Sequence, residues 1–312
     1  MRHTMSRNFL SMDDLSGEEL AFLLDLSEKA KASPGDYAGR LSGLAVAMVF
    51  EKPSTRTRVS LDVGIASLGA HPVALSAAEL QLGRGETVED TGRVLSRYVD
   101  AIVIRTFGQD RLEALASTST VPVVNALSDF EHPCQCLADL LTIREKKGEL
   151  AGLVLAYVGD GNNVAHSLLI GGAKVGMTVR VATPPGFEPI PQVVGRARDL
   201  AGESGSGARI MVTNDRTEAV AGADVLYTDV WASMGQEEEA NERTLVLQNY
   251  RLDRDAVELA AEDAIVLHCL PAHRGQEITD EVIDGPHSVV WDQAENRLHT
   301  QKALLLWLLD RA

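Results

Sequence analysis

Residues 51–58 carry the densest group of chemically useful side chains in the sequence. They read Glu-Lys-Pro-Ser-Thr-Arg-Thr-Arg and lie between two apolar runs, residues 44–50 and 59–68. This order predicts a buried strand, a turn and the start of a helix. A helix start exposes unpaired N–H groups and partial positive charge, to which hydroxyls and guanidiniums add donors. An ordinary N-cap would explain one hydroxyl but neither guanidinium, so the segment predicts an oxyanion site.

The chain as a whole is acidic, so an anionic ligand must be held by local positive charge. Its 312 residues include 29 Lys and Arg against 45 Asp and Glu, a formal net charge of −16. This charge repels nucleic acid and anionic lipid, and we expect neither nucleic acid nor a membrane as a partner. The basic candidates for the anion site are Arg56, Arg58, Arg105, His132, His268 and Arg297.

Two of these candidates come directly after predicted strands. Arg105 ends the apolar run 101–105, and His132 comes after the run 121–124, at the start of a helix predicted over 132–147. In open parallel sheets, ligands bind beyond the carboxyl ends of the strands. Either residue alone is more often structural, because loop ends are polar anyway. Their convergence with residues 54–58 is what favours a site.

Residues 159–164, Gly-Asp-Gly-Asn-Asn-Val, contain half of a dinucleotide-binding fingerprint. The third glycine position is Val164, and residues 182–184, about 20 positions on, include no acidic ribose ligand. A nicotinamide-dependent dehydrogenase is therefore the weaker alternative. Asn162 and Asn163 could instead grip a substrate carboxylate or cap the next helix.

Two more polar segments come after predicted strands in the second half of the chain. Asp229 comes after the run 223–228, where it is placed either to meet a cationic amine or to cap a helix. Cys269 comes after the run 264–268, and a small buried thiol is usually inert packing. A Cys-His nucleophile with His268 is disfavoured, since neighbours on a strand point to opposite faces.

Short apolar runs alternate with helical patterns along the chain, which predicts two α/β domains with parallel sheets. A capping-box pattern from Ser16 to Glu19 predicts an N-terminal helix, and further helices are predicted over 87–98 and 293–309. The predicted strands are residues 44–50, 101–105, 121–124, 153–158, 178–182, 208–212, 223–228 and 264–268. We expect domains at 1–147 and 148–292, with a C-terminal helix in 293–312 that packs back on the first domain.

The sequence favours a cytoplasmic protein. No apolar stretch approaches the roughly 20 residues that cross a bilayer. Residues 1–7 run into acidic positions without an apolar core, which argues against a targeting peptide. The 3 cysteines are too few and too unevenly placed for a disulfide framework or a zinc site, so we expect reduced thiols.

Together these segments resemble the aspartate/ornithine transcarbamoylase family, and most closely its ornithine-using branch. The resemblance rests on residues 54–58, Arg105, residues 132–135, 229–235 and 268–271, in the same order over nearly the whole chain. It implies two doubly wound domains joined by helices, with the active site in the cleft between them. It also implies a homotrimer or a multiple of trimers, carbamoyl phosphate and L-ornithine as partners, and no metal or organic cofactor.

The resemblance assigns roles residue by residue. It implies carbamoyl phosphate binding by Ser54, Thr55, Arg56, Thr57, Gln81, Arg105, His132, Gln135, Cys269, Leu270 and Arg297, with Gln81 reaching a neighbouring subunit's site. It implies ornithine binding by Asn163, Asp229, Ser233 and Met234, and catalytic roles for Arg105, His132, Asp229 and Cys269. The bond between Leu270 and Pro271 resembles the family's cis peptide.

The implied reaction transfers the carbamoyl group of carbamoyl phosphate to the δ-amine of L-ornithine, giving L-citrulline and phosphate, as in arginine biosynthesis. The alternatives are another amine, such as putrescine, N-acetylornithine or a lysine analogue, and a non-catalytic anion-binding protein. The segment 229–235 favours ornithine, because the similarity there is to the family's ornithine-binding loop.

Overall fold

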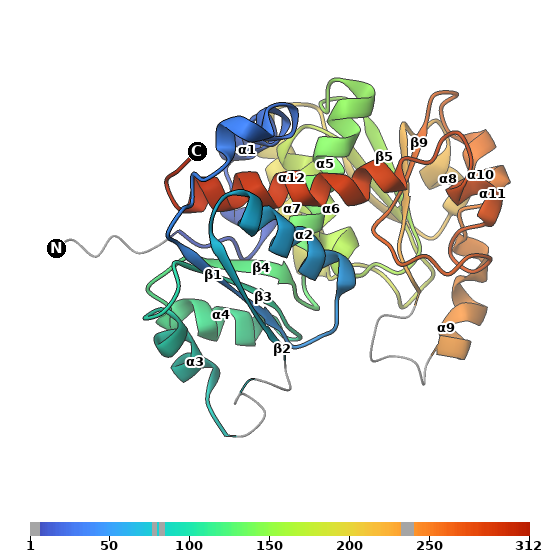
Figure 1. Ribbon diagram of the computed structural model, residues 1–312. Helices are drawn as coiled ribbons and strands as arrows, with labels where there is room; N and C mark the ends of the chain where they lie inside the picture. The colour runs from blue at the N-terminus through green and yellow to red at the C-terminus, as the bar shows by residue number, and fades with distance from the viewer. Residues whose placement is uncertain (1–6, 77–79, 81–84, 232–239) are drawn as a thin grey trace. The chain divides into compact units, whose positions relative to one another are not determined.

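The computed structural model describes residues 7–76, 80, 85–231 and 240–312 (Figure 1). The chain separates into two compact units. Unit 1 contains the chain up to Ala138 together with Asn296–Ala312, and unit 2 is Asp139–Glu295. Helices α5 (Pro133–Lys147) and α12 (Val290–Leu308) each contribute residues to both units. The predicted domain boundaries stay a prediction.

Unit 1 is built on a four-stranded parallel sheet with strand order β2-β1-β3-β4. Its strands are β1 (Ala45–Phe50), β2 (His71–Ser76), β3 (Ala101–Arg105) and β4 (Val123–Leu127). The predicted strands at β1 and β3 are confirmed, whereas β4 begins two residues later than predicted. β2 was not predicted, because this edge strand is only half-buried and its short apolar run, residues 72–75, begins with a proline.

Both faces of this sheet are covered, which explains the continuous apolar runs of its central strands. Ala47 and Val49 of β1 pack in a cluster with Leu112 and Leu115 of α4 (Gln109–Thr118). The alternate residues of β1, such as Met48, point the other way and are also buried. The fold class predicted for this half, a parallel α/β domain, is confirmed.

The remaining helices of unit 1 start where local capping chemistry places them. α1 (Gly17–Ala32) has the predicted capping box: the Ser16 hydroxyl accepts from the Glu19 N–H at 3.1 Å, and the Glu19 carboxylate accepts from the Ser16 N–H at 2.9 Å. The other helices are α2 (Thr55–Ser67) and α3 (Val88–Leu95), which ends three residues earlier than predicted.

The C-terminal part of α12 contacts α1 and the N-terminal segment within unit 1. The Lys31 ammonium donates to the Asn296 amide oxygen at 2.8 Å, and the Arg7 guanidinium lies 4.3 Å from the centre of the Trp307 ring. α12 begins at Val290, three residues before the predicted start. Its first two residues, Val290 and Trp291, are apolar but are followed by a polar stretch, so they are separated from the apolar end of the helix, which begins near Ala303, and the apolar pattern did not include them.

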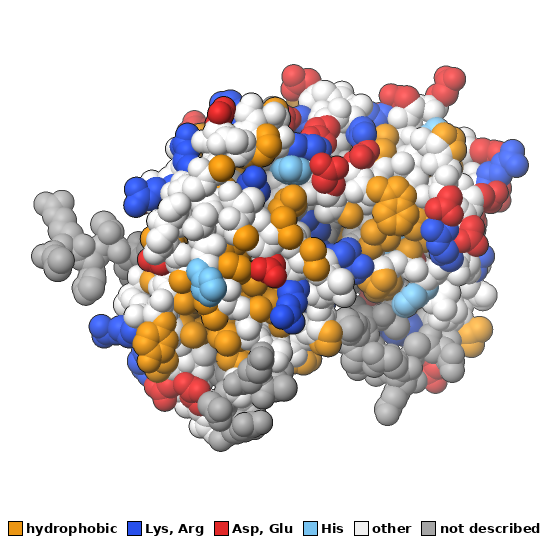
Figure 2. All heavy atoms as spheres, viewed as in Figure 1, with side chains coloured by type: hydrophobic (Ala, Val, Ile, Leu, Met, Phe, Trp, Pro, Cys, Tyr) orange, Lys and Arg blue, Asp and Glu red, His pale blue; other side chains and the backbone are white. Residues whose placement is uncertain are grey.

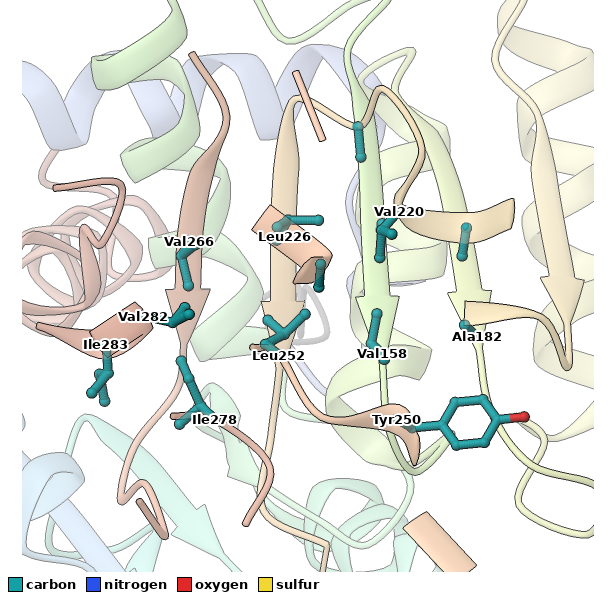
Figure 3. Close-up of a cluster of buried hydrophobic side chains, with 14 of the residues drawn as sticks. Val158, Ala182, Val220, Leu226, Tyr250, Leu252, Val266, Ile278, Val282 and Ile283 are labelled. Atoms are coloured by element: carbon teal, nitrogen blue, oxygen red, sulfur yellow. The ribbon is translucent and has the colours of Figure 1, made fainter. Parts of the chain in front are cut away.

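Unit 2 is built on a five-stranded parallel sheet with strand order β7-β6-β5-β8-β9. Its strands are β5 (Val154–Val158), β6 (Thr178–Ala182), β7 (Ile210–Thr213), β8 (Val225–Thr228) and β9 (Ile265–His268), each within two residues of its prediction. Figure 3 shows one buried face of this sheet, where Val158, Leu226 and Val266 come from three neighbouring strands. The second predicted α/β domain is confirmed.

The helices of unit 2 alternate with its strands, as predicted from the sequence. They are α6 (Asn163–Lys174), α7 (Pro191–Ser204), α8 (Arg216–Val220), α9 (Ala240–Leu247), α10 (Arg254–Leu259) and α11 (Asp280–Ile283). No helix in the described part of the chain is long and apolar enough to cross a membrane. On the face drawn in Figure 2, acidic and basic side chains are interspersed.

Candidate functional site

In unit 1 the chemically active residues gather where the strand order reverses. From β1 the chain passes to β2 on one side of the sheet, whereas β3 lies on its other side. Phe50 at the end of β1 pairs with Arg105 at the end of β3. Ligands of open parallel sheets bind at such a reversal, outside the carboxyl ends of the strands. The loop after β1 leads directly into α2, so the helix start lies at this same edge.

The start of α2 brings hydroxyl, N–H and guanidinium groups close together. Ser54 is its N-cap, and the Ser54 hydroxyl accepts from the Thr57 N–H at 3.3 Å. Arg297 of α12 donates from Nη2 to the Thr57 hydroxyl oxygen at 2.6 Å, with both side chains buried. A guanidinium therefore reaches the first turn of a helix, where the peptide dipoles already favour an anion.

His132 lies among three guanidiniums and is 4% exposed. Burial lowers the pKa of His132 well below its ordinary value, and the positive charges of Arg297, Arg105 and Arg56 lower it further. The imidazole is therefore neutral near pH 7, and it can donate one N–H without adding a charge. We call Ser54, Arg56, Thr57, Arg105, His132 and Arg297 the oxyanion cluster.

The other residues predicted for this site lie near the cluster in the sequence but differ in exposure. Gln135, in the first turn of α5, is buried, and its N–H donates to the His132 carbonyl at 3.0 Å. Thr55 and Arg58 are exposed. Thr55 is the first residue of α2, so its backbone N–H has no partner within the helix and can donate to a ligand. Gln81 lies outside the described residues.

A second group of charged residues connects the loops that follow β1, β3 and β4. The Glu51 carboxylate, after β1, accepts from the Thr106 hydroxyl after β3 and from Arg111 of α4. Lys52 pairs with Asp129 after β4 at 2.5 Å. Three strand-end loops are thereby fixed to one another. No role was predicted for Glu51 and Lys52, because their partners are 55 or more residues away in the sequence.

In unit 2 the corresponding reversal of strand order lies between β5 and β8. β6 and β7 extend the sheet on one side, and β9 extends it on the other. Tyr157 of β5 pairs with Tyr227 of β8, and Thr228 of β8 pairs with His268 of β9. The residues directly after these strands therefore meet at one edge of the sheet.

Asp229 is the centre of this second cluster and is 6% exposed. Its Oδ1 accepts from the Cys269 thiol at 2.8 Å and from the Val230 N–H at 2.8 Å. Its Oδ2 accepts from the Asn162 amide at 2.8 Å. Three donors therefore face the two oxygens of this side chain. We call Asn162, Asp229 and Cys269 the carboxylate cluster.

The Cys269 thiol donates to a carboxylate, which does not fit the role of a nucleophile. A nucleophilic cysteine needs a base or positive charge beside it, and here the adjoining group is negative. None of the three cysteines forms a disulfide. Burial also raises the pKa of Cys134 to about 12, so that thiol stays protonated near pH 7.

His268 is engaged by the loop after β9 and does not activate Cys269. Its Nδ1 accepts from the Leu270 N–H at 2.9 Å, and its Nε2 lies 3.0 Å from Glu277 Oε1. The donor atoms of Asp229, His268 and Cys269 lie within 4.8 Å of one another. Because both nitrogens of His268 already have partners, the three residues do not fit a metal site in this arrangement.

Leu270 has a backbone conformation that leucine rarely adopts, with φ of 58°. A non-glycine residue there costs of order 1–3 kcal/mol and often marks a functional site. The Leu270–Pro271 peptide bond is cis, as expected. The buried Glu277 carboxylate accepts from the His273 N–H at 2.6 Å and pairs with His268, so it holds the loop after Leu270.

The half fingerprint of residues 159–164 has a packing explanation. A Cβ at Gly161 would lie 2.4 Å from the Pro189 backbone nitrogen and 2.6 Å from the Phe187 carbonyl oxygen. Glycine is therefore required by the close approach of the 187–189 loop rather than by a dinucleotide. Asn162 caps α6, one of the two alternatives for the asparagines, and Asn163 is the first residue of α6.

Several residues of this site were not predicted from the sequence. Tyr157 donates to the Asn162 amide oxygen at 3.1 Å, and Glu277 holds the 270–277 loop. Tyr157 lies inside an apolar strand, and Glu277 lies in a polar loop, so neither has a local pattern that would identify it. Ser233 and Met234 lie outside the described residues.

Comparison with known proteins identifies both halves of the chain. Residues 7–145 match the family model "Aspartate/ornithine carbamoyltransferase, carbamoyl-P binding domain", and residues 151–308 match "Aspartate/ornithine carbamoyltransferase, Asp/Orn binding domain". The ornithine carbamoyltransferase of Parafrankia sp. (strain EAN1pec) is 62% identical over 98% of this chain and 96% of its own. That of Acidothermus cellulolyticus is 60% identical over 99% and 98%.

A solved structure agrees with the sequence comparison. The ornithine carbamoyltransferase from Pyrococcus furiosus superposes with a TM-score of 0.93 at 52% identity, covering 98% of each chain. The similarity therefore extends over both sheets and not over one domain only.

Proposed function

Because the chain belongs to the aspartate/ornithine carbamoyltransferase family, we propose that it transfers the carbamoyl group of carbamoyl phosphate to the δ-amine of L-ornithine, giving L-citrulline and phosphate. One observation carries the proposal beyond family membership. Each parallel sheet has a polar cluster at the reversal of its strand order, and the two clusters have opposite charge. A cationic cluster suits carbamoyl phosphate, and a carboxylate cluster suits an amine.

Carbamoyl phosphate is the ligand of the oxyanion cluster in this proposal. The phosphate is bound by Ser54, Thr55, Arg56 and Thr57, where the helix start adds N–H donors. Arg105, His132 and Gln135 bind the carbamoyl end. Arg297, Cys269 and Leu270 complete the carbamoyl phosphate site, and Gln81 comes from a neighbouring subunit.

Ornithine is the ligand of the carboxylate cluster. Asp229 binds an amine of ornithine, and Asn163, Ser233 and Met234 bind the rest of the molecule. The hydrogen bonds of Asp229 support this assignment, because its carboxylate accepts from three donors of the described residues and has a further acceptor position for an ammonium.

The chemical step is attack of the neutral δ-amine on the carbonyl carbon of carbamoyl phosphate. As the carbon–nitrogen bond forms, the carbonyl oxygen becomes negative and accepts hydrogen bonds from Arg105, His132 and the Thr57 hydroxyl. The carbon–oxygen bond to phosphate then breaks, and Arg56 with the start of α2 stabilises the departing phosphate. The neutral state of His132 suits this donor role, since the imidazole gives an N–H but cannot also supply a proton.

The attacking amine must lose a proton, because an alkylammonium resembles lysine, with a pKa near 10.4. Asp229 does not remove it, since a carboxylate beside an ammonium stabilises the charged form. The neutral amine is therefore the form that attacks. Once the carbon–nitrogen bond has formed, that nitrogen carries one more proton, and the phosphate of the tetrahedral intermediate is the base that we propose for this second proton. Holding two small reactants in line supplies roughly 7–11 kcal/mol of the barrier reduction.

The proposal includes the assembly and the setting of the protein. We propose a homotrimer, or a multiple of trimers, that works in the cytoplasm in arginine biosynthesis without a metal or organic cofactor. The resemblance of Gln81 to the family residue that enters a neighbouring site supports the trimer.

The test is citrulline formation by the purified protein with carbamoyl phosphate and a panel of amines. L-Ornithine, putrescine, N-acetyl-L-ornithine and L-aspartate are supplied in parallel at equal concentration. We expect turnover with ornithine and little with the others. Turnover with another amine alone would leave the carbamoyl phosphate site in place and contradict the assignment of Asp229, Ser233 and Met234.

A further inference from the structure

Asn162 lies between the start of α6 and Asp229, and the proposed reaction gives it no role. We propose that Asn162 is a positioning residue: it orients the Asp229 carboxylate, so that one lone pair of Oδ2 is directed at an amine of ornithine. The inference rests on the proposed function and deepens it.

The orientation of the Asn162 amide is fixed by its neighbours. Its Oδ1 lies within hydrogen-bond distance of three donors, the N–H groups of Val164 (2.9 Å) and Ala165 (3.3 Å) and the hydroxyl of Tyr157 (3.1 Å). The two N–H groups can only donate, so the amide oxygen must face them. The Nδ2 end therefore faces Asp229 and donates to its Oδ2 at 2.8 Å.

The hydrogen bonds of Asp229 leave a defined place for a substrate. A carboxylate offers about four acceptor positions, two on each oxygen. Within the described residues, Val230 and Cys269 occupy both positions on Oδ1, and Asn162 occupies one on Oδ2. The remaining position is on the oxygen that Asn162 holds. A substrate ammonium would therefore bind beside the Asn162 amide, and losing that amide would free the carboxylate to turn.

The choice of asparagine also separates this role from ordinary capping. Ser16, Thr87 and Asp215 cap other helices of the chain through acceptor oxygens. Serine, threonine and aspartate are as good as asparagine, or nearly so, as N-caps. Only an amide has a separate acceptor end for the helix and an NH₂ end for a second partner. Capping alone does not require asparagine at position 162, whereas capping together with holding Asp229 does.

Two substitutions keep the cap and remove the donor to Asp229. In Asn162→Ser the hydroxyl can cap α6 but is too short to reach Asp229. In Asn162→Asp the cap is retained, and a second carboxylate faces Asp229 in place of the amide. Asp215→Ser is the matched control, because Asp215 caps α8 by the same two-bond geometry, at 2.8 and 3.2 Å, within the same unit.

We expect both Asn162 variants to raise the KM for ornithine roughly tenfold or more, the effect of losing a hydrogen bond to a charged group. The dissociation constant for carbamoyl phosphate, measured by calorimetry, should stay at the wild-type value in both variants. The thermal midpoint should stay at the wild-type value in Asn162→Ser, which adds no charge beside Asp229, and fall in Asn162→Asp, where two carboxylates repel each other. Asp215→Ser should leave both substrate constants unchanged. Tyr157→Phe, which removes one donor to the Asn162 oxygen and keeps the cap, should give a smaller rise in the ornithine KM.

Three results separate the possibilities. An unchanged ornithine KM in both Asn162 variants would overturn the positioning role. An equal loss of affinity for both substrates, with a lower thermal midpoint, would also overturn it and leave Asn162 as a helix cap only. If the wild-type protein forms no citrulline, the proposed function itself is wrong, whatever the variants do.

Discussion

At the scale of single residues, the oxyanion cluster combines permanent positive charge with one neutral donor. Arg56, Arg105 and Arg297 remain charged at any relevant pH, and together with burial they keep His132 neutral. The charged residues and the neutral residue therefore have different roles. The guanidiniums attract the dianionic substrate, while His132 donates to the carbonyl oxygen without competing for the phosphate.

Arg105 is the residue whose loss should affect the chemical step most. Replacing Arg105 with glycine removes a charged donor to the developing oxyanion, and the loss of one such donor lowers turnover by roughly 100- to 1,000-fold. Arg105 ends β3, and its side chain is only partly buried, so the variant should stay folded. Steady-state kinetics and circular dichroism check the two expectations. Wild-type turnover in a folded Arg105→Gly protein would remove Arg105 from the mechanism.

The lowered pKa of His132 should make the free energy of unfolding depend on pH. The pKa of His132 is lowered in the folded protein. When the pH falls below about 6.5, the ordinary pKa of histidine, His132 therefore binds a proton in the unfolded chain but stays neutral in the folded protein. The stability due to neutral His132 is therefore present above pH 6.5 and is lost as the pH falls. Urea unfolding from pH 7.5 to 5 should show a shallower loss in His132→Asn, by at most about 1.4 kcal/mol per pH unit. Parallel slopes for both proteins would show that His132 is protonated in the folded state.

At the scale of elements, function depends on the loops at the carboxyl ends of the strands. The parallel register aligns the ends of β1 and β3 in one sheet and of β8 and β9 in the other. Loops from distant parts of the sequence then meet at one edge. The loop after β5 also needs space, because residues 187–189 pack directly on Gly161.

Gly161 should tolerate a side chain poorly, because a Cβ there would meet backbone atoms of another loop. In Gly161→Ala the new Cβ would overlap backbone atoms of Pro189 and Phe187, and overpacking of this kind costs roughly 1–3 kcal/mol. Asn162 adjoins Gly161, so ornithine affinity should fall as well. Urea unfolding and the ornithine KM measure the two effects.

Gly195→Ala is the control for this prediction. Gly195 lies inside α7, and an added Cβ there meets nothing within 4 Å. Alanine should therefore stabilise the helix by up to about 1 kcal/mol. If both alanine variants behave alike, the close approach at Gly161 has no effect on the protein.

The sequence could predict those elements and residues whose signal is local. Eight of the nine strands in the described residues contain short runs of apolar and β-branched residues and were predicted, whereas β2, whose apolar run begins with Pro72, was not. The family motif identified Arg105, His132 and Asp229 as candidates. The partners that orient neighbouring groups, such as Tyr157 for Asn162 and Glu277 for His268, depend on tertiary contacts, for which one sequence gives no signal.

At the scale of the whole molecule, a positive site lies in a chain of net charge −16. Acidic side chains over the surface favour solubility and repel nucleic acid, and the cationic cluster acts at short range only. In the proposed trimer, one residue of each active site, Gln81, belongs to a neighbouring subunit.

Mixed subunits test this sharing of residues. Arg105→Gly and Gln81→Ala should each be nearly inactive alone. In a mixed trimer, a site can combine the intact Arg105 of one subunit with the intact Gln81 of its neighbour, so activity should return after the two proteins are unfolded and refolded together. A mixture no more active than its components would show that Gln81 serves its own subunit or none.

The most direct measurement of the central claim is the stoichiometry of the reaction. Purified protein with carbamoyl phosphate and L-ornithine should release citrulline and phosphate in equal amounts, and the rate should fall to the uncatalysed level when either substrate is omitted. Catalysed phosphate release without citrulline would indicate a phosphatase-like activity at the oxyanion cluster, and it would contradict carbamoyl transfer to ornithine.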